Sequence, residues 1–229
     1  PTEHPGDNAA ELPHITEANA TDNKPGAVTS IPFKELLKDR SVLAMFAGYC
    51  CILSVFYGLL TWMPSYLHQT HGLNISGMGG ATFLIFMCGF VGELVGGYLG
   101  DKWKSSGASP NLVMRSMFSG SALVAALCML GTAYASEASQ AIGLLCVAMF
   151  FIRWCGMYWC IPSILGGTSK TGVLAGTMNF CGNMAGVIVP ILIGLIVQFT
   201  GSYFLVLIFF VVMAMVVGIF SSLIDNREG

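Results

Sequence analysis

Charged side chains are scarce in this 229-residue chain: they make up 10% of it, whereas roughly 25% is usual for a soluble domain. Hydrophobic residues account for 55%, and the mean hydropathy is +0.72. The net charge of −2 offers no basic surface of the kind that binds a nucleic-acid backbone. We therefore expect an integral membrane protein in contact with a lipid bilayer and without a nucleic-acid partner.

Cysteine is absent from the predicted connecting loops. All eight cysteines lie inside apolar runs, which is not the distribution of a disulfide framework or of a loop-borne metal site. The chain also lacks a G-x-S-G sequence, an H-E-x-x-H sequence and a pair of membrane aspartates. We expect no metal, no cofactor and no enzymatic activity.

Large apolar residues are almost missing from residues 1–32, which hold five of the nine prolines and five acidic residues. Such a composition cannot offset the entropy of ordering and predicts a flexible cytoplasmic segment. Residues 33–40 place apolar side chains at helical spacing among charges, which predicts an amphipathic lead-in or simply a polar start to the first span. Because no signal peptide precedes Pro1, we expect a piece of a longer protein.

Six apolar runs follow, each at or above the roughly 20 residues that cross a bilayer. They are 42–67, 76–100, 112–134, 139–163, 171–198 and 202–224. Nine of the ten Lys and Arg residues flank alternate ends of these runs, and the other connections carry none. By the positive-inside rule both termini are cytoplasmic, in the cell membrane.

A weak internal repeat relates the two halves of residues 41–225. Trp62 to Leu67 close the first run, and the similar sequence from Trp159 to Leu165 closes the fourth. Three helices repeated in series must have inverted topology, which is typical of transporters. The sequence thus predicts an all-α membrane protein built from two inverted three-helix units.

The fifth run carries one narrow stripe of small and polar residues. Its members recur at spacings of three or four and fall on one helical face: Gly172, Gly176, Asn179, Asn183, Gly186 and Pro190. We expect this stripe to face protein or a watery cavity, because an amide in hydrocarbon needs a partner. The other faces, Leu174 included, are expected to meet lipid; close packing alone would also explain the glycines.

The end of the second run resembles a cytoplasmic loop motif of the major facilitator superfamily. The matching residues are Gly97, Gly100, Asp101 and Lys102. Two further stretches, 61–67 and 179–190, are similar to the seventh and eleventh helices of its anion:cation symporter family. Glycines 92, 96 and 100 form a ridge for close helix packing, which we expect to lack its partner in one isolated half.

This resemblance implies the C-terminal six-helix half of a secondary transporter for small organic anions such as sugar acids. It implies a missing N-terminal six-helix half as partner and coupling to a cation, a proton in particular. It also implies that Asn179 and Trp159 contact the solute. Distance along each span places Tyr57 and Asn183 within about 4 Å of the membrane midplane, where transporters bind substrate.

Arg153 and Glu93 are the two formal charges deep in the predicted spans, and each is costly unless paired or wet. They could form a structural ion pair; alternatively, Arg153 could bind the anionic solute, and Glu93 could take up the coupling proton. Two other functions remain open: a membrane-embedded interaction or sensor module without transport, and an intramembrane enzyme.

Overall fold

The computed structural model describes residues 37–225, apart from the side chains of residues 168 and 169, and its regular structure there is entirely helical. The elements are α3 (Arg40–His71), α4 (Ile75–Ser105), α5 (Pro110–Ala133), α6 (Ala138–Ile152), the 3₁₀ segment η1 (Arg153–Cys160), α7 (Ile161–Thr200) and α8 (Phe204–Leu223). Gly167 interrupts α7 with φ 54° and ψ −160°, a conformation that glycine tolerates best. Residues 37–225 therefore contain 6 membrane-length helices, as predicted, with Ala138–Gly167 the fourth and Lys170–Thr200 the fifth.

The helix ends follow from capping residues in the sequence. Asp39, Asn74 and Ser109 each accept a hydrogen bond from a backbone N–H in the first turn of α3, α4 and α5. Gly72 and Gly201 end α3 and α7 in the left-handed conformation. These caps extend most helices beyond the apolar runs, because a capped helix can continue into the polar layer outside the hydrocarbon.

One segment differs from the sequence-based expectation, and another is only partly described by the structure. The predicted loop motif of residues 97–102 is not a loop, because α4 stays helical through Ser105 and the connection is only 106–109. Of the lead-in, residues 37 and 38 form a turn, while 33–36 and the predicted flexible segment 1–32 lie outside the described residues.

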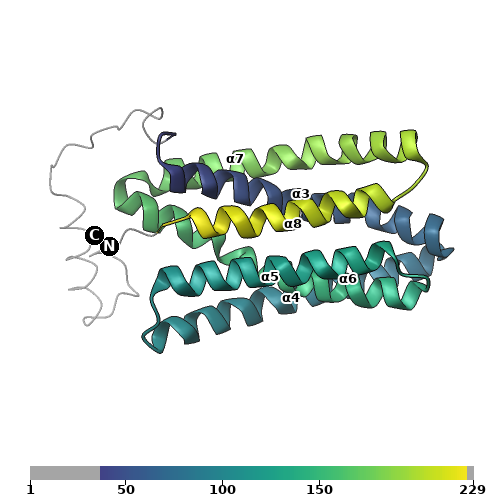
Figure 1. The fold of residues 1–229 in the computed structure, drawn as a ribbon, viewed down its shortest axis with the longest axis horizontal. Helices are drawn as coiled ribbons and strands as arrows, with labels where there is room; N and C mark the ends of the chain where they lie inside the picture. Colours follow the sequence, from purple (N-terminus) through teal and green to yellow (C-terminus); the bar gives the residue numbers. More distant parts are fainter. Residues whose placement is uncertain (1–36, 226–229) are drawn as a thin grey trace, which may run out of the picture.

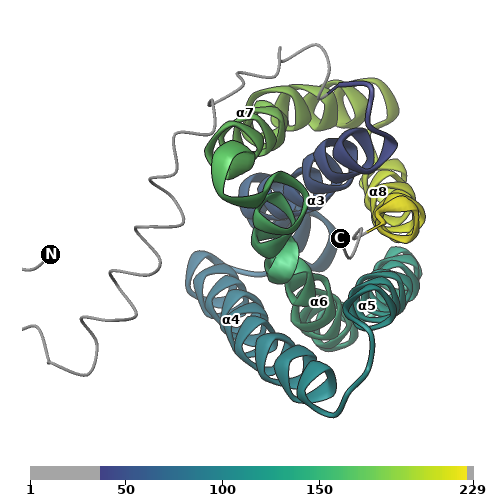
Figure 2. The same cartoon turned by 90° about the vertical axis from the view of Figure 1, so that its left-hand side faces the viewer.

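The helices form one bundle in which α3 is the most enclosed element (Figure 1). It packs mainly against α7 and α8, while α5 packs against α6 and α8, and α4 against α6 and η1. Within the most apolar window, 67% of α3 is buried, against 22% in both α4 and α7. Helices α4 and α7 lie at separate edges of the bundle (Figure 2), so the described residues leave one broad face of each uncovered.

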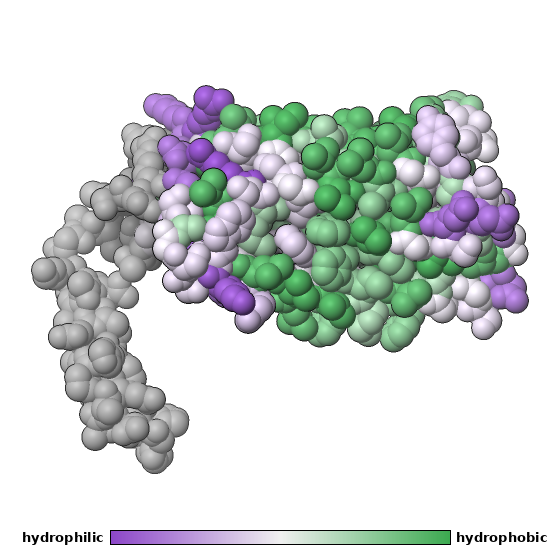
Figure 3. Space-filling view, turned by 60° about the horizontal axis from the view of Figure 1, so that its bottom comes forward, coloured by the Kyte–Doolittle hydropathy of each residue, from purple (hydrophilic) through white to green (hydrophobic). Residues whose placement is uncertain are grey.

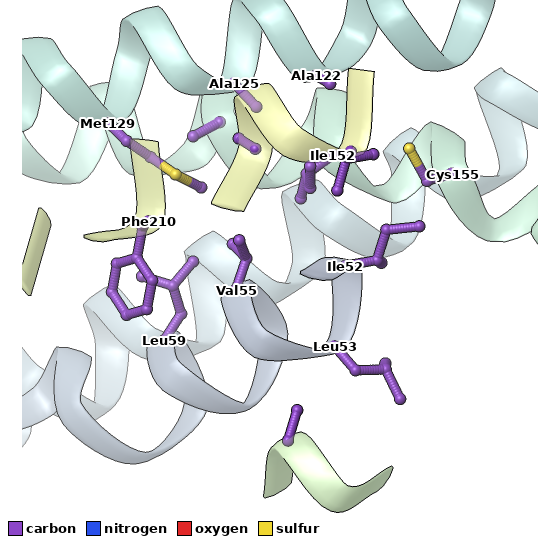
Figure 4. Packing of buried hydrophobic residues seen from close by; sticks show 14 of the residues in the cluster. Ile52, Leu53, Val55, Leu59, Ala122, Ala125, Met129, Ile152, Cys155 and Phe210 are labelled. Atoms are coloured by element: carbon purple, nitrogen blue, oxygen red, sulfur yellow. The ribbon is translucent and has the colours of Figure 1, made fainter. Parts of the chain in front are cut away.

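Small side chains let the helices approach one another in the core. One buried cluster contains Ile52 and Val55 of α3, Ala122 and Ala125 of α5, and Ile152 of α6 (Figure 4). All five are buried. Since lipid tails are as apolar as these side chains, close packing rather than exclusion from water holds such helices together.

The buried face of α7 differs from the one expected. Leu174, Met178, Ala185, Val189 and Ile193 are each at most 4% exposed and pack towards the core. The prediction that Leu174 meets lipid is therefore wrong. The amides and the first two glycines of the stripe lie beside this buried face and are exposed, which agrees with a face left for a cavity or another helix.

Basic residues gather at one end of the bundle. We call this the basic end; it comprises residues 37–40, 101–115, 166–172 and 223–225, where α3 begins and α8 ends (Figure 1). In Figure 3 hydrophilic residues lie at both ends, and a hydrophobic belt separates them. This distribution identifies an integral membrane protein whose axis crosses the bilayer.

The glycine ridge of α4 makes contacts within this chain. A Cβ at Gly92 would overlap the backbone of Phe150, while one at Gly96 would lie 2.8 Å from the ring of Trp154. At Gly100 a Cβ would lie 2.6 Å from the Met157 sulfur. The expectation that this ridge lacks a partner in the isolated half is wrong, because α6 and η1 provide it.

Gly92→Ala should push α4 away from α6 and lower the free energy of unfolding by about 1–3 kcal/mol. Gly97→Ala is the matched control, because nothing lies within 4 Å of a Cβ there and alanine favours a helix by up to about 1 kcal/mol. Melting temperatures in detergent test this, and equal melting temperatures for the two variants would contradict the assigned contact.

Candidate functional site

Three polar side chains of α3 and α7 form a hydrogen-bonded chain near the middle of their spans. The Tyr57 hydroxyl donates to Asn183 Oδ1 at 2.6 Å. Asn183 Nδ2 donates to Asn179 Oδ1 at 2.7 Å and to the Asn179 carbonyl oxygen at 2.8 Å. The stripe predicted on α7 thus meets a tyrosine of α3. These hydrogen bonds satisfy most of the polar groups of the two asparagine side chains without water.

The two asparagines are left with different capacities. Both side-chain groups of Asn183 are engaged by protein, so this residue mainly fixes its neighbours. Asn179 Nδ2 has no hydrogen-bond partner among residues 37–225, and the residue is exposed. Asn179 therefore keeps two N–H donors that an added oxygen acceptor could use.

An aromatic pair, Tyr49 and Trp159, lies next to these hydrogen-bonded side chains. Tyr49 was not among the residues predicted from the sequence. The ring of Tyr49 meets that of Trp159 edge-on, with centroids 5.7 Å apart, and Trp159 is 49% exposed. The signal was present, because Tyr49 precedes Tyr57 by eight residues and so shares its helical face. We call Tyr49, Tyr57, Trp159, Asn179 and Asn183 the amide–aromatic cluster.

Two glycines of α7 bring the cluster together. A Cβ at Gly182 would lie 2.6 Å from the Tyr49 ring, and one at Gly186 would lie 3.2 Å from the Tyr57 ring. Both rings therefore rest almost directly on the α7 backbone. Of the glycines in the predicted stripe, Gly172 and Gly176 have open space instead, so they do not serve packing within the described chain.

Arg153 and Glu93 form an ion pair between η1 and α4. The guanidinium carbon also lies 5.4 Å from the centroid of the Phe56 ring, in a cation–π contact. Gly156 makes room for the carboxylate, since a Cβ there would lie 2.5 Å from Glu93 Oε1. The ion pair stabilises both charges at a depth where isolated charges are costly, and the ring contact adds to the stabilisation of Arg153.

The pair remains accessible and adjoins the cluster. The Glu93 side chain is 42% exposed and that of Arg153 is 26% exposed, at the wall of a hollow of about 360 Å³ that Phe86 and Phe90 also line. The Phe56 ring that Arg153 contacts also lies edge-on to the Tyr57 ring of the cluster, with centroids 5.6 Å apart. Cluster and ion pair thus form one polar wall along α3, η1, α4 and α7.

Arg153 and Trp159 both lie in η1, which is an unusual element for the middle of a span. A 3₁₀ segment of 8 residues is long, because its hydrogen-bond geometry is poorer than that of an α-helix. Such segments often mark hinges. The side chains that face the wall from the fourth span are therefore carried by its least regular part.

The predicted loop-motif residues are separate from this wall. Gly97, Gly100, Asp101 and Lys102 lie in the last turns of α4, at the basic end. Asp101 is exposed and lies 3.8 Å from the Lys104 nitrogen. Gly100 packs on η1, so the motif touches the segment that carries the wall without contributing to it.

Comparisons with known proteins show which family the chain resembles. The chain is 29% identical over 212 residues to the Probable galactarate/D-glucarate transporter GudP of Escherichia coli, covering 89% of this chain and 47% of that protein. It is 31% identical to another Probable galactarate/D-glucarate transporter of Escherichia coli, GarP, covering 91% of this chain and 49% of that protein. The hexuronate transporter of Bacillus subtilis is 29% identical, with 82% and 46% covered.

The solved structure of a fucose:proton symporter variant from Escherichia coli, FucP, matches with a TM-score of 0.70 at 15% identity, covering 87% of this chain and 46% of that one. At this identity the match shows the fold alone. The chain spans about half the length of the relatives it matches. The family model of the Major Facilitator Superfamily matches residues 2–190, and the chain therefore belongs to that superfamily.

Proposed function

We propose that the chain forms one half of a secondary active transporter for small organic anions, sugar acids in particular. The observation that carries this proposal is the polar wall on a face that the described residues leave uncovered. Its similarity to a probable galactarate/D-glucarate transporter and to a hexuronate transporter supports the solute class. A second six-helix half, the N-terminal one, would complete the cavity and allow alternating access.

Within the wall we assign different roles to its residues. Asn179 donates to a carboxylate or hydroxyl oxygen of the solute through its unengaged amide, and the exposed face of Trp159 covers the carbon chain. Tyr57 and Asn183 hold Asn179 in place through their hydrogen bonds. This division explains why a wall with few charges can still recognise a highly oxygenated solute.

For Arg153 and Glu93 we propose an ion pair that stabilises the fold and also serves coupling. Glu93 is the one carboxylate of residues 37–225 that lies in the middle of a span, so it is the group here that could accept a proton. Its partial exposure gives a proton access. Protonation would release Arg153, whose guanidinium could then attract a solute carboxylate.

We place the basic end in the cytoplasm and both termini with it, in the cell membrane, because positively charged loops are retained on that side. A sensor module would also expose a polar wall, but it predicts no solute movement across the membrane. An intramembrane enzyme would need a nucleophile or an activated water, and the amide–aromatic cluster offers neither.

Galactarate uptake into vesicles should require the upstream half together with this chain, since one half provides only one wall of the cavity. Asn179→Leu should abolish uptake, because the free donors are lost, whereas Gln198→Leu, at the outer end of α7, is the matched control and should transport normally. Saturable uptake by residues 1–229 alone, or full activity of Asn179→Leu, would overturn the proposal.

Arg153→Met should lower the free energy of unfolding by about 2 kcal/mol, less than a fully buried pair would cost, because it strands the Glu93 carboxylate. Adding Glu93→Gln should restore most of the melting temperature but abolish solute-driven proton uptake. Arg115→Met, which breaks bonds to Ile224 and Asp225, is a control that Glu93→Gln should not rescue. A stable Arg153→Met with unrescued loss of anion binding would assign Arg153 to the solute alone.

Single cysteines in a cysteine-free version test the orientation. Cysteines at Thr70 and Glu137 should react with an impermeant thiol reagent added outside intact cells, and one at Ser106 should react only after the membrane is opened. All three residues are exposed in the fold, so reactivity reports sidedness. The inverse labelling pattern would place the basic end outside.

A further inference from the structure

A hollow of about 510 Å³ lies between α4 and α5 at the basic end, beside η1. It is lined by Leu99, Lys102, Trp103, Ser106, Met117 and Trp154. The hollow exists because α4 packs against α6 and η1 while α5 packs against α8, and α4 and α5 make few contacts with each other. We call it the α4–α5 groove.

The rim of the groove carries an uncompensated positive charge. Lys102 is exposed, and its nitrogen contacts the Tyr98 ring at 5.9 Å rather than a carboxylate. The adjacent carboxylate, Asp101, is turned to Lys104. Among the described residues Lys102 therefore has no anionic partner, and it lies where the helix leaves the hydrocarbon layer.

The wall of the groove has the two features that a lipid needs below its headgroup. Leu99, 39% exposed, provides apolar surface for an acyl chain, and Trp103, 40% exposed, is an aromatic residue of the kind that lies at the membrane interface. The Trp154 indole nitrogen is buried and lacks a hydrogen-bond partner among residues 37–225.

We propose that the α4–α5 groove binds one anionic phospholipid, with its phosphate on Lys102 and an acyl chain along Leu99 and Trp103. Charge complementarity selects the lipid, because a lysine at the membrane surface attracts anionic headgroups. Occupancy fills the gap between two loosely joined helices and supports η1 through Trp154. The site lies within this chain and does not depend on the proposed transport.

Thermal unfolding of the purified protein in detergent tests the proposal. Phosphatidylglycerol should raise the melting temperature, because a ligand of the folded state stabilises it, and phosphatidylcholine with the same acyl chains should raise it far less. Lys102→Gln should lose at least half of the rise, while Lys38→Gln, an exposed lysine outside the groove, should keep it. Free glycerol phosphate should have no effect, since the acyl chain is missing.

Fluorescence quenching locates the lipid independently of stability. With about one brominated-chain phosphatidylglycerol per protein, Trp103→Phe should lose a large part of the quenching, and Trp62→Phe, at the opposite end of α3, should retain it. Equal stabilisation by both lipids, an unchanged rise in Lys102→Gln, or equal quenching in the two tryptophan variants would each overturn the assignment.

Discussion

The rest of the structure depends on one constraint: inside a bilayer, polar groups must find partners within the protein. The chain meets it at three places in η1 and the middle of α7. Arg153 is paired with Glu93, Tyr158 is hydrogen-bonded to Ser221 at 2.7 Å, and the α7 amides are bonded to Tyr57. Each pair joins elements that are distant in sequence. The polar residues are therefore also the contacts that fix which helices are neighbours.

Glycines make these pairings possible. Gly156 admits the Glu93 carboxylate, and Gly186 lets Tyr57 lie on the α7 backbone close to Asn183. In water such close contacts would compete with burial of larger side chains, but in lipid they are the main source of attraction between helices. The same residues that let backbones approach thus bring the candidate site together, and packing and function have a common physical origin here.

The sequence predicted what hydrophobic length and charge placement decide. Six spans, the gathering of basic residues at one end, the Arg153–Glu93 pair as one of two accounts, and the uncovered stripe with Asn179 all follow from those patterns. It could not predict η1, because these residues belong to one continuous apolar run, 139–163, that carries no signal for a 3₁₀ segment. The burial of Leu174 was missed for a similar reason: in a helix that is apolar on several sides, only tertiary contacts decide which apolar face is covered. Tyr49 was missed although its spacing from Tyr57 marked it.

The distribution of tight and open contacts bears on how a half of this kind could move. Contacts inside the bundle are specific and close, as at Gly92 and Gly182, and they favour rigid-body behaviour. The uncovered faces of α4 and α7 carry large side chains without such glycine contacts, including Phe90, Leu94, Val187 and Ile191. A partner surface meeting these faces can slide without breaking hydrogen bonds, because apolar contacts are non-directional. On the proposed function, the half would rock as one body while Asn179 and Trp159 keep their geometry towards the solute, and η1, the least regular element, would absorb the remaining strain.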